Sequence, residues 1–359
     1  MNLTTGVVED PKAEEALTLQ RKYGVVTALE TTRASAVDPD FFRVNQAAGI
    51  VAINVTLASP EARKGDSTER WTFERIIKSI DEWHEAVARH GDGTNALVPV
   101  LSVEDILRAR QEGRVGIIFG TQGGGYWIDR EFLLLRTAYR LGVRIIGISY
   151  QRRTIYMDGA GEKSNAGIST VGEALVDELN RLGIVIDLSH SAERSALEII
   201  ERSRHPVIFS HNNPRTLSPV PENITDREID AIAANGGVIG ISCFSPDCMP
   251  DYRNPQRPNV DDYVRHLDYV VQRIGPDHVG LGLDYAYKRR QEDLDLHNVQ
   301  YGDILPEQRV ETVQVDGLTY APEVVNVTSR MLRLGYPEDA IAKILSGNFL
   351  RVFRTVWGS

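Results

Sequence analysis

The sequence is poor in cysteine, in long apolar runs and in positive charge, and each shortage excludes a class of protein. Cys243 and Cys248 are its only cysteines, and four intervening residues are not a zinc-ribbon spacing, so we interpret them as incidental thiols. No apolar run approaches the roughly 18 residues that span a membrane, and the N-terminus lacks the basic and apolar regions of a secretory signal. A net charge of -10 argues against a nucleic-acid partner. We expect a cytoplasmic protein that acts on a small molecule, without nucleic acid or membrane.

Short runs rich in Val and Ile recur between longer amphipathic stretches. Eight of them are almost continuously apolar: "GVVTA", "GIVAINVTLA", "VGIIFG", "VRIIGISY", "GIVIDLSH", "HPVIFSH", "GGVIGISCF" and "DHVGLGLD". Continuous apolar runs are typical of parallel strands covered on both faces, whereas the strands of an antiparallel sandwich would alternate. The sequence therefore favours an α/β fold with a parallel sheet.

Helical patterns separate these runs. In "SAERSALEIIERS" the residues Ala196, Ile199 and Ile200 share one apolar face, and Thr225 followed by Glu228 has the spacing of a capping box. Eight strand–helix repeats predict a (β/α)8 TIM barrel. A Rossmann-type sheet is the alternative, but its GxGxxG motif is absent, and the nearest stretch, "GTQGGGYW", lacks the spacing.

The domain organisation predicted from the sequence is simple. No linker rich in Pro or Ser divides the chain, so we expect residues 1–359 to form a single barrel domain. The segment 285–320 is polar and shows little apolar periodicity. We predict that it forms a long loop after the last strand, where barrels often carry substrate or dimer contacts.

Polar residues close most of the predicted strands. Because the active site of a barrel lies at the C-terminal ends of its strands, these side chains should converge. They are Glu30, Thr31, Gln122, Tyr150, His190, His211 and Asp284. Two imidazoles and a carboxylate at three strand ends suit zinc or a similar divalent ion, or acid–base chemistry.

Several longer motifs carry a family resemblance. "GIVIDLSHSAERS", "PVIFSH", "GGVIGIS", "HLDYVVQRIGPDHVGLGLD" and "AIAKILSGNFLRVFR" together resemble the renal (membrane) dipeptidase family of metallopeptidases, from about residue 100 to the C-terminus. The resemblance implies a (β/α)8 barrel of the metal-dependent hydrolase type and a homodimer. In active members it implies a dinuclear zinc site that hydrolyses dipeptides with a bridging hydroxide.

Part of the family's metal site is present. His190 and His211 match the two histidines that bind one zinc ion, and Asp284 matches the aspartate after the last strand. The first strand of the family ends in a His-x-Asp pair for the other ion, but this chain has Leu29 and Thr31 there. The resemblance therefore implies at most one zinc or similar divalent ion, or none.

The remaining positions also depart from the family. Gln122 aligns with the bridging glutamate, and a neutral amide offsets the repulsion between two cations poorly. Tyr150 aligns with a substrate-side histidine, and Glu222 aligns with the arginine that grips the substrate carboxylate, a role that Arg215 could assume. We assign catalysis to Asp284 and Tyr150, and we assign metal binding to the two histidines. The predicted substrate-binding residues are Gln122, Glu222, Arg215 and Glu30.

Three functions fit these residues. The first is a dipeptidase-family hydrolase that acts on a small peptide-like or amide metabolite with at most one metal ion. The second is a metal-free enzyme of the same fold that performs proton transfer on an amine-bearing small molecule held by Glu222. The third is a catalytically inactive dipeptidase homologue. The retained histidines and Asp284 disfavour the third, and the family resemblance favours the first over the second.

Overall fold

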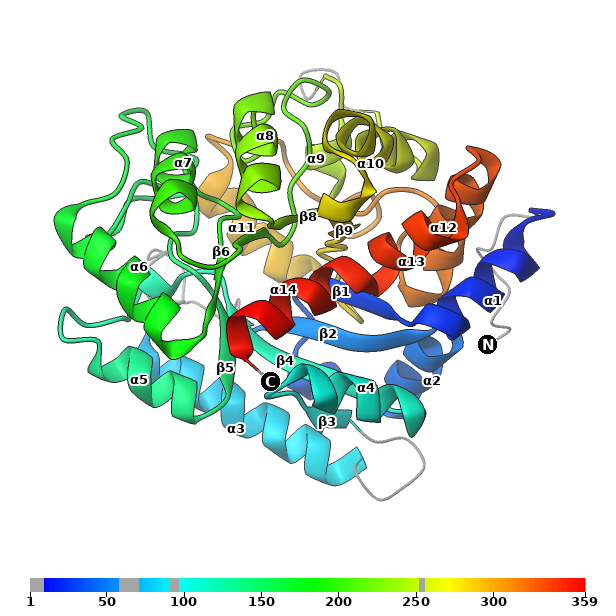
Figure 1. Cartoon of the computed structure of the whole chain (residues 1–359), viewed down its shortest axis with the longest axis horizontal. Helices are drawn as coiled ribbons and strands as arrows, with labels where there is room; N and C mark the ends of the chain where they lie inside the picture. The colour runs from blue at the N-terminus through cyan, green and yellow to red at the C-terminus, as the bar shows by residue number, and fades with distance from the viewer. Residues whose placement is uncertain (1–9, 58–70, 91–96, 252–255, 359) are drawn as a thin grey trace.

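The computed structural model describes residues 10–57, 71–90, 97–251 and 256–358 (Figure 1). Within these ranges one parallel sheet contains β1 (Val25–Glu30), β2 (Ile50–Thr56), β3 (Leu97–Pro99), β4 (Val115–Thr121), β5 (Val143–Gly147), β6 (Val185–Asp187), β7 (Ile208–Phe209), β8 (Val238–Ile241) and β9 (Val279–Leu281). Eight strands close into a ring, because β1 pairs with both β2 and β9, and β2 also pairs with β4. The predicted (β/α)8 barrel is confirmed. The short strand β3, which the sequence did not suggest, pairs with β4 outside the ring.

Helices surround this ring. They are α1 (Ala13–Tyr23), α2 (Pro39–Ala47), α3 (Phe73–His90), α4 (Val103–Gln111), α5 (Leu133–Arg140), α6 (Thr170–Leu182), α7 (Glu193–Arg202), α8 (Asp226–Asn235), α9 (Ser245–Cys248), α10 (Val260–Ile274), α11 (Gln291–Tyr301), α12 (Val324–Arg333), α13 (Glu338–Ala342) and α14 (Asn348–Trp357), with the short turns η1 (Ala34–Ala36), η3 (Gly124–Tyr126), η4 (Pro276–His278), η5 (Ala321–Glu323) and η6 (Lys343–Gly347). The predicted capping box of α8 is confirmed, since the Glu228 carboxylate accepts from the Thr225 amide at 2.7 Å and the Thr225 hydroxyl accepts from the Glu228 amide at 3.4 Å.

One end of the barrel is closed by α14, which crosses the strands in Figure 1. Phe349 and Phe353 of this helix are fully buried against the apolar residues that begin the strands, such as Val26 and Val238. Gly280 in β9 lets the Phe349 ring approach the sheet, because a Cβ atom at that position would collide with the ring. The closed end is the N-terminal end of the strands, so a ligand must enter from the opposite end.

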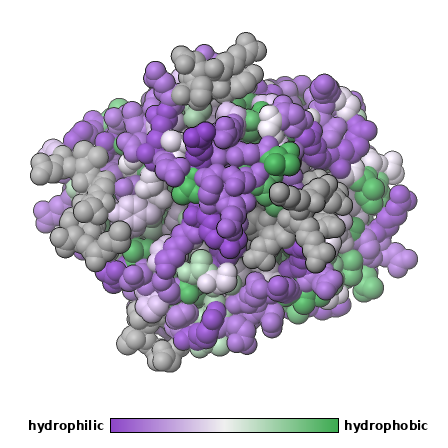
Figure 2. Space-filling view, turned by 180° about the vertical axis from the view of Figure 1, so that it is seen from behind, coloured by the Kyte–Doolittle hydropathy of each residue, from purple (hydrophilic) through white to green (hydrophobic). Residues whose placement is uncertain are grey.

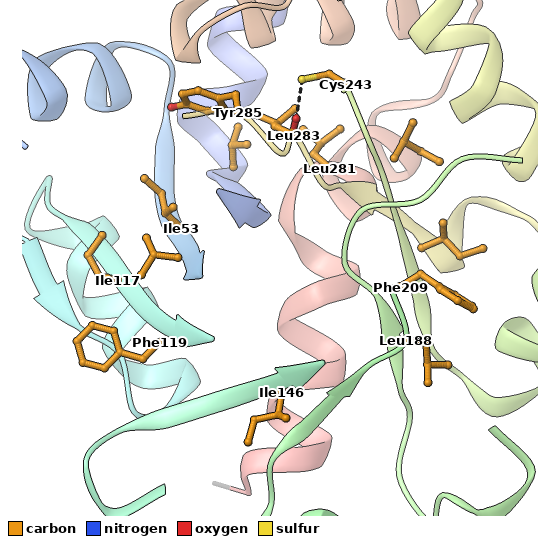
Figure 3. Close-up of a cluster of buried hydrophobic side chains, with 14 of the residues drawn as sticks. Ile53, Ile117, Phe119, Ile146, Leu188, Phe209, Cys243, Leu281, Leu283 and Tyr285 are labelled. Atoms are coloured by element: carbon orange, nitrogen blue, oxygen red, sulfur yellow. Dashed lines mark hydrogen bonds between the residues drawn. The ribbon is translucent and has the colours of Figure 1, made fainter. Parts of the chain in front are cut away.

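Apolar side chains from most of the strands pack beside the ring. Figure 3 shows Ile53, Ile117, Phe119, Ile146, Leu188, Phe209 and Leu281 in this cluster, which extends to the loops after β8 and β9. Cys243 belongs to it, and its thiol donates a hydrogen bond to the Leu283 carbonyl at 2.6 Å. Both cysteines are buried free thiols, which agrees with their interpretation as incidental residues.

The segment after β9 differs from its prediction. Residues 285–320 were expected to form a loop throughout, but Gln291–Tyr301 form the helix α11. Its buried residues, Leu294 and Tyr301, are seven positions apart and therefore lie on one face after two turns. So few apolar positions give a weak periodicity in the sequence, which is why the helix was missed.

No helix within the described residues is both long enough and apolar enough to cross a bilayer. The face opposite α14, seen in Figure 2, is mostly hydrophilic, with small apolar areas between the polar side chains. The described side chains on this face are thus mainly polar.

Candidate active site

A pocket lies at the C-terminal ends of the barrel strands. Seven of the residues predicted from the sequence line it: Thr31, Gln122, Tyr150, His190, His211, Glu222 and Asp284. Other residues in its wall include Trp71, Phe244, Asp247, Arg289 and His297. The loops after β1, β4, β5, β6, β7 and β9 therefore bring predicted side chains together in one place.

His211 is held in one orientation by the residues beneath it. The Ser210 hydroxyl donates to Asp187 Oδ2 at 2.6 Å, and the Ser210 amide donates to Asp187 Oδ1 at 2.9 Å. Because that hydroxyl proton is already used, Ser210 Oγ accepts from His211 Nδ1, which is 2.6 Å away. Burial and the neighbouring His190 keep the pKa of His211 well below its ordinary value. His211 is thus neutral, and its Nε2 lone pair faces the pocket.

His190 faces this lone pair of His211. Its Nε2 is 2.9 Å from His211 Nε2 and 2.9 Å from Gln122 Oε1, so a proton on Nε2 can be donated to either acceptor. Its Nδ1 is 3.1 Å from the amide nitrogen of Gln151, which also donates to Glu222. The backbone of His190 is left-handed, with φ 65°, a conformation that few residues other than glycine adopt. The turn after β6 therefore aims the imidazole at the pocket at some conformational cost.

Three carboxyl groups share the pocket with these imidazoles. Burial raises the pKa of Asp284 to about 6 even though Arg289 opposes the shift, and it raises the pKa of Glu222 to about 7. Asp247 is also buried, and both burial and the Glu222 charge raise its pKa well above the ordinary value. Carboxyl groups with raised pKa values in a pocket are suited to accept and return protons near neutral pH.

Tyr150 connects the histidines to the α11 helix. Its ring lies against His190 with a centroid separation of 4.2 Å, and its hydroxyl is 3.2 Å from His297 Nε2. His297 comes from α11, so the helix that was predicted as a loop supplies a polar residue to the pocket wall. The Tyr150 hydroxyl is therefore positioned by a second imidazole.

The residues present do not fit a dinuclear metal site. Leu29 is buried in the protein core, Thr31 supplies a hydroxyl, and Gln122 supplies a neutral amide where charged ligands would be required. Among the described residues, no group of three or more His, Cys, Asp or Glu side chains has the geometry to hold a metal ion. Two converging imidazole Nε2 atoms and the Gln122 oxygen could serve one divalent ion at most.

Two predicted substrate-binding residues do not line the pocket. The Arg215 guanidinium donates to the backbone carbonyls of Asn223 and Pro221, at 2.7 and 2.8 Å, so it braces the loop that carries Glu222. Glu30 is fully buried behind the pocket and accepts from the hydroxyls of Thr27 and Thr32 at 3.0 and 3.3 Å. Glu30 was predicted from its strand-end position and Arg215 from the family resemblance, and neither fixes the direction of a side chain. At both positions local hydrogen bonds turn it away from the pocket.

Burial raises the pKa of Glu30 to about 8, which makes stability depend on pH. The folded protein holds this proton more tightly than the unfolded chain, so stability falls as pH rises between the unfolded pKa of 4.5 and the folded value. Glu30→Gln should remove this loss. Between these two pKa values, the free energy of unfolding of the variant minus that of the parent should increase by about 1.4 kcal/mol per pH unit.

Urea unfolding of the Glu30→Gln variant and the parent protein at several pH values checks this expectation. Glu307→Gln, in which the replaced carboxylate is an exposed group, is the matched control and should leave the slope unchanged. Parallel curves for Glu30→Gln and the parent would show that Glu30 does not retain its proton in the folded protein.

Asp247, Arg289 and His297 are among the pocket residues that the sequence did not predict. Asp247 belongs to the short helix α9 after β8, where the apolar run was read as continuing to Phe244. Arg289 and His297 belong to the segment that was expected to be a loop, and Arg289 donates to the Asp284 carbonyl at 2.9 Å. These three residues could have been suspected from the sequence because they follow strand ends, Asp247 after β8 and the other two after β9.

This fold and pocket define a parallel (β/α)8 barrel with an imidazole and carboxylate centre at its open end. The family model described as "Membrane dipeptidase (Peptidase family M19)" matches residues 4–304, and the chain belongs to this family of hydrolases.

Curated relatives and solved structures agree with this assignment. Dipeptidase tcpJ of Claviceps purpurea (strain 20.1) is 31% identical over 255 residues, which are 70% of this chain and 54% of that protein. Dipeptidase aclJ of Aspergillus oryzae is 31% identical and aligns with 78% of this chain and 60% of its own length. The chain thus spans little more than half of these fungal relatives.

The structural matches cover nearly the whole barrel. An amidohydrolase from Pseudomonas aeruginosa has a TM-score of 0.82 and 27% identity, with 96% of this chain and 99% of the other covered. A metallo peptidase from Rhodobacter sphaeroides, liganded with a phosphinate mimic of the dipeptide L-Ala-D-Ala, has a TM-score of 0.73 and 19% identity, with 93% and 99% covered. The second likeness shows the fold alone.

Proposed function

We propose that this protein hydrolyses an amide bond in a small peptide-like metabolite, with at most one divalent ion at His190 and His211. The observation that carries the proposal is the convergence of the two imidazole Nε2 atoms, 2.9 Å apart, beside Asp284 in a barrel of the dipeptidase family. The names of the relatives, which include dipeptidases, support a peptide-like substrate.

Each side chain of the pocket has its own role in the proposed reaction. A zinc or similar ion at the two Nε2 atoms would supply Lewis acidity toward the amide carbonyl. Asp284, with its pKa of about 6, is mostly ionised at neutral pH and can take a proton from the attacking water. The same carboxyl then returns the proton to the leaving amine. The ring of Tyr150 covers one face of His190 and keeps this imidazole in place.

A second candidate function has its own supporting observation. The proton on His190 Nε2 lies between two acceptors, His211 Nε2 and Gln122 Oε1, so the two imidazoles are linked directly without an ion. Such a network is also stable without an ion, so metal-free proton transfer on an amine-bearing molecule is the alternative. An inactive homologue is a further alternative, which the buried carboxyl groups in the pocket disfavour because isolated buried charges are costly.

Elemental analysis of protein purified without chelator, together with a His190→Ala/His211→Ala double variant, tests the proposal. About one divalent ion per chain, lost in the variant, is the expected result. A panel of L,L and L,D dipeptides with added zinc then tests turnover, and no hydrolysis of any member would refute the proposal. The resemblance also predicts a homodimer, which light scattering of the purified chain would test.

A further inference from the structure

Two carboxyl groups face each other in the pocket wall. Glu222 comes from the loop after β7, and Asp247 comes from the short helix α9 after β8. Their exposed fractions are 7% and 2%, and each affects the protonation of the other through a side-chain contact. Carboxylates so close together repel each other unless a proton or a cation lies between them.

Among the described residues, His190 Nδ1 lies 3.4 Å from Glu222 Oε2, but this nitrogen accepts from the Gln151 amide and so carries no proton that would make it a cation. No lysine or arginine in the described part of the chain forms an ion pair with Glu222 or Asp247, and no hydrogen-bond donor reaches the buried Oδ1 atom of Asp247. Arg289, the arginine of the pocket wall, donates instead to the Asp284 carbonyl and to the Thr31 hydroxyl, at 2.9 and 3.2 Å. A buried carboxyl oxygen without a donor costs free energy, and a ligand that brings a donor would recover it.

The surrounding wall also suits a positive group. Trp71, Tyr150 and Phe244 line the same pocket, and the Trp71 and Tyr150 rings lie 5.5 Å apart between centroids. Aromatic faces attract cations, and the attraction grows when water is excluded. The carboxyl pair and the aromatic wall therefore select for the same charge.

We propose that the substrate of this pocket carries a protonated amine, which binds between Glu222 and Asp247 and donates to Asp247 Oδ1. This inference rests on the proposed function only for the choice of site, and it adds the charge of the substrate. The amine would occupy the part of the pocket that Glu222 and Asp247 line.

Binding of small probes to the full chain tests the inference without turnover. The probes are n-butylamine, butan-1-ol and butyrate, which share a carbon chain and differ in charge, and calorimetry gives their dissociation constants. The amine should bind at least about 10-fold more tightly than the alcohol, since one hydrogen bond to a charged group contributes about 1.5–3 kcal/mol. Equal affinity for amine and alcohol, or tighter binding of butyrate, would overturn the inference.

Variants of the two carboxyl residues test whether these residues cause the preference for the amine. Asp247→Asn should weaken amine binding by about 10-fold or more and leave alcohol binding unchanged. Asp303→Asn is the control, because Asp303 is an exposed carboxylate paired with Arg152 and does not line the pocket. Glu222→Gln provides a second test if the first variant does not fold, and the probe series on the parent protein needs no variant at all. Undiminished amine affinity in a folded Asp247→Asn or Glu222→Gln protein would contradict the proposed binding position.

The two proposals can fail separately. If the amine binds selectively but no amide is hydrolysed, the proposed function fails and the inference about charge stands. If amides are hydrolysed with the same kcat/KM whether or not they carry an amine, the proposed function stands and the inference fails.

Discussion

Replacing His211 with alanine is expected to lower kcat/KM for amide hydrolysis by about 10²–10⁴-fold. The Ser210–Asp187 pair fixes the proton on Nδ1, so Nε2 of His211 is the one imidazole lone pair that the hydrogen bonds direct into the pocket with a defined tautomer. The alanine variant lacks the His211 imidazole, one of the two imidazoles on which the proposed chemistry depends. Steady-state kinetics on a hydrolysed dipeptide, with metal content measured on the same samples, checks this result.

His205→Ala is the matched control for the His211 variant. His205 precedes β7, whereas His211 follows it, and its side chain is not part of the pocket wall. The control should retain the activity of the parent protein. If the His211 variant kept its activity as well, the imidazole pair would not take part in the reaction, and the proposed mechanism would be wrong.

Asp284→Asn is expected to reduce kcat/KM by a similar factor and to change its pH dependence. In the parent protein the carboxyl must be ionised to accept a proton, so kcat/KM should rise with pH through about 6 and then level off. The amide of the variant cannot ionise near neutral pH, so its residual activity should lack this acidic limb. The pH profiles of the two proteins, measured from pH 5 to 8 (about the range of a shifted carboxyl), give the comparison.

Stability separates a catalytic effect of Asp284 from a structural one. Burial raises the pKa of Asp284, so its ionisation destabilises the folded protein as pH rises, and a neutral asparagine should not be less stable at neutral pH. A variant that is inactive yet at least as stable as the parent fits the assigned role. An acidic limb that persists in Asp284→Asn would assign the titration to another group, such as Glu222.

The eight ring strands could be predicted from the sequence because each is buried on both faces. A run such as "VGIIFG" has no polar face, and all eight such runs supply strands of the closed ring. The meeting of His190, His211 and Asp284 followed from the same rule, since parallel strands bring their C-terminal ends to one end of the barrel. The continuous apolar runs thus predict both the fold and the location of the pocket.

The parts that could not be predicted depend on loop conformation. Arg215 and Glu222 are seven residues apart in one loop, yet the backbone of that loop turns the carboxyl into the pocket and the guanidinium onto carbonyl groups. His297 reaches the pocket because α11 folds over the open end of the barrel, and two buried residues are too few to reveal this helix as a periodic pattern. The directions of these side chains depend on tertiary hydrogen bonds, which cannot be recognised in a single sequence.

The left-handed backbone at His190 and Asp284, with φ of 65° and 47°, has a consequence for protein engineering. Each such residue costs the fold about 1–2 kcal/mol relative to a relaxed conformation. Glycine at either position would recover part of that free energy and would delete a side chain of the pocket. A selection for heat resistance alone would therefore enrich glycine at these two positions, so a thermostabilised form of this barrel should be evolved under simultaneous selection for activity.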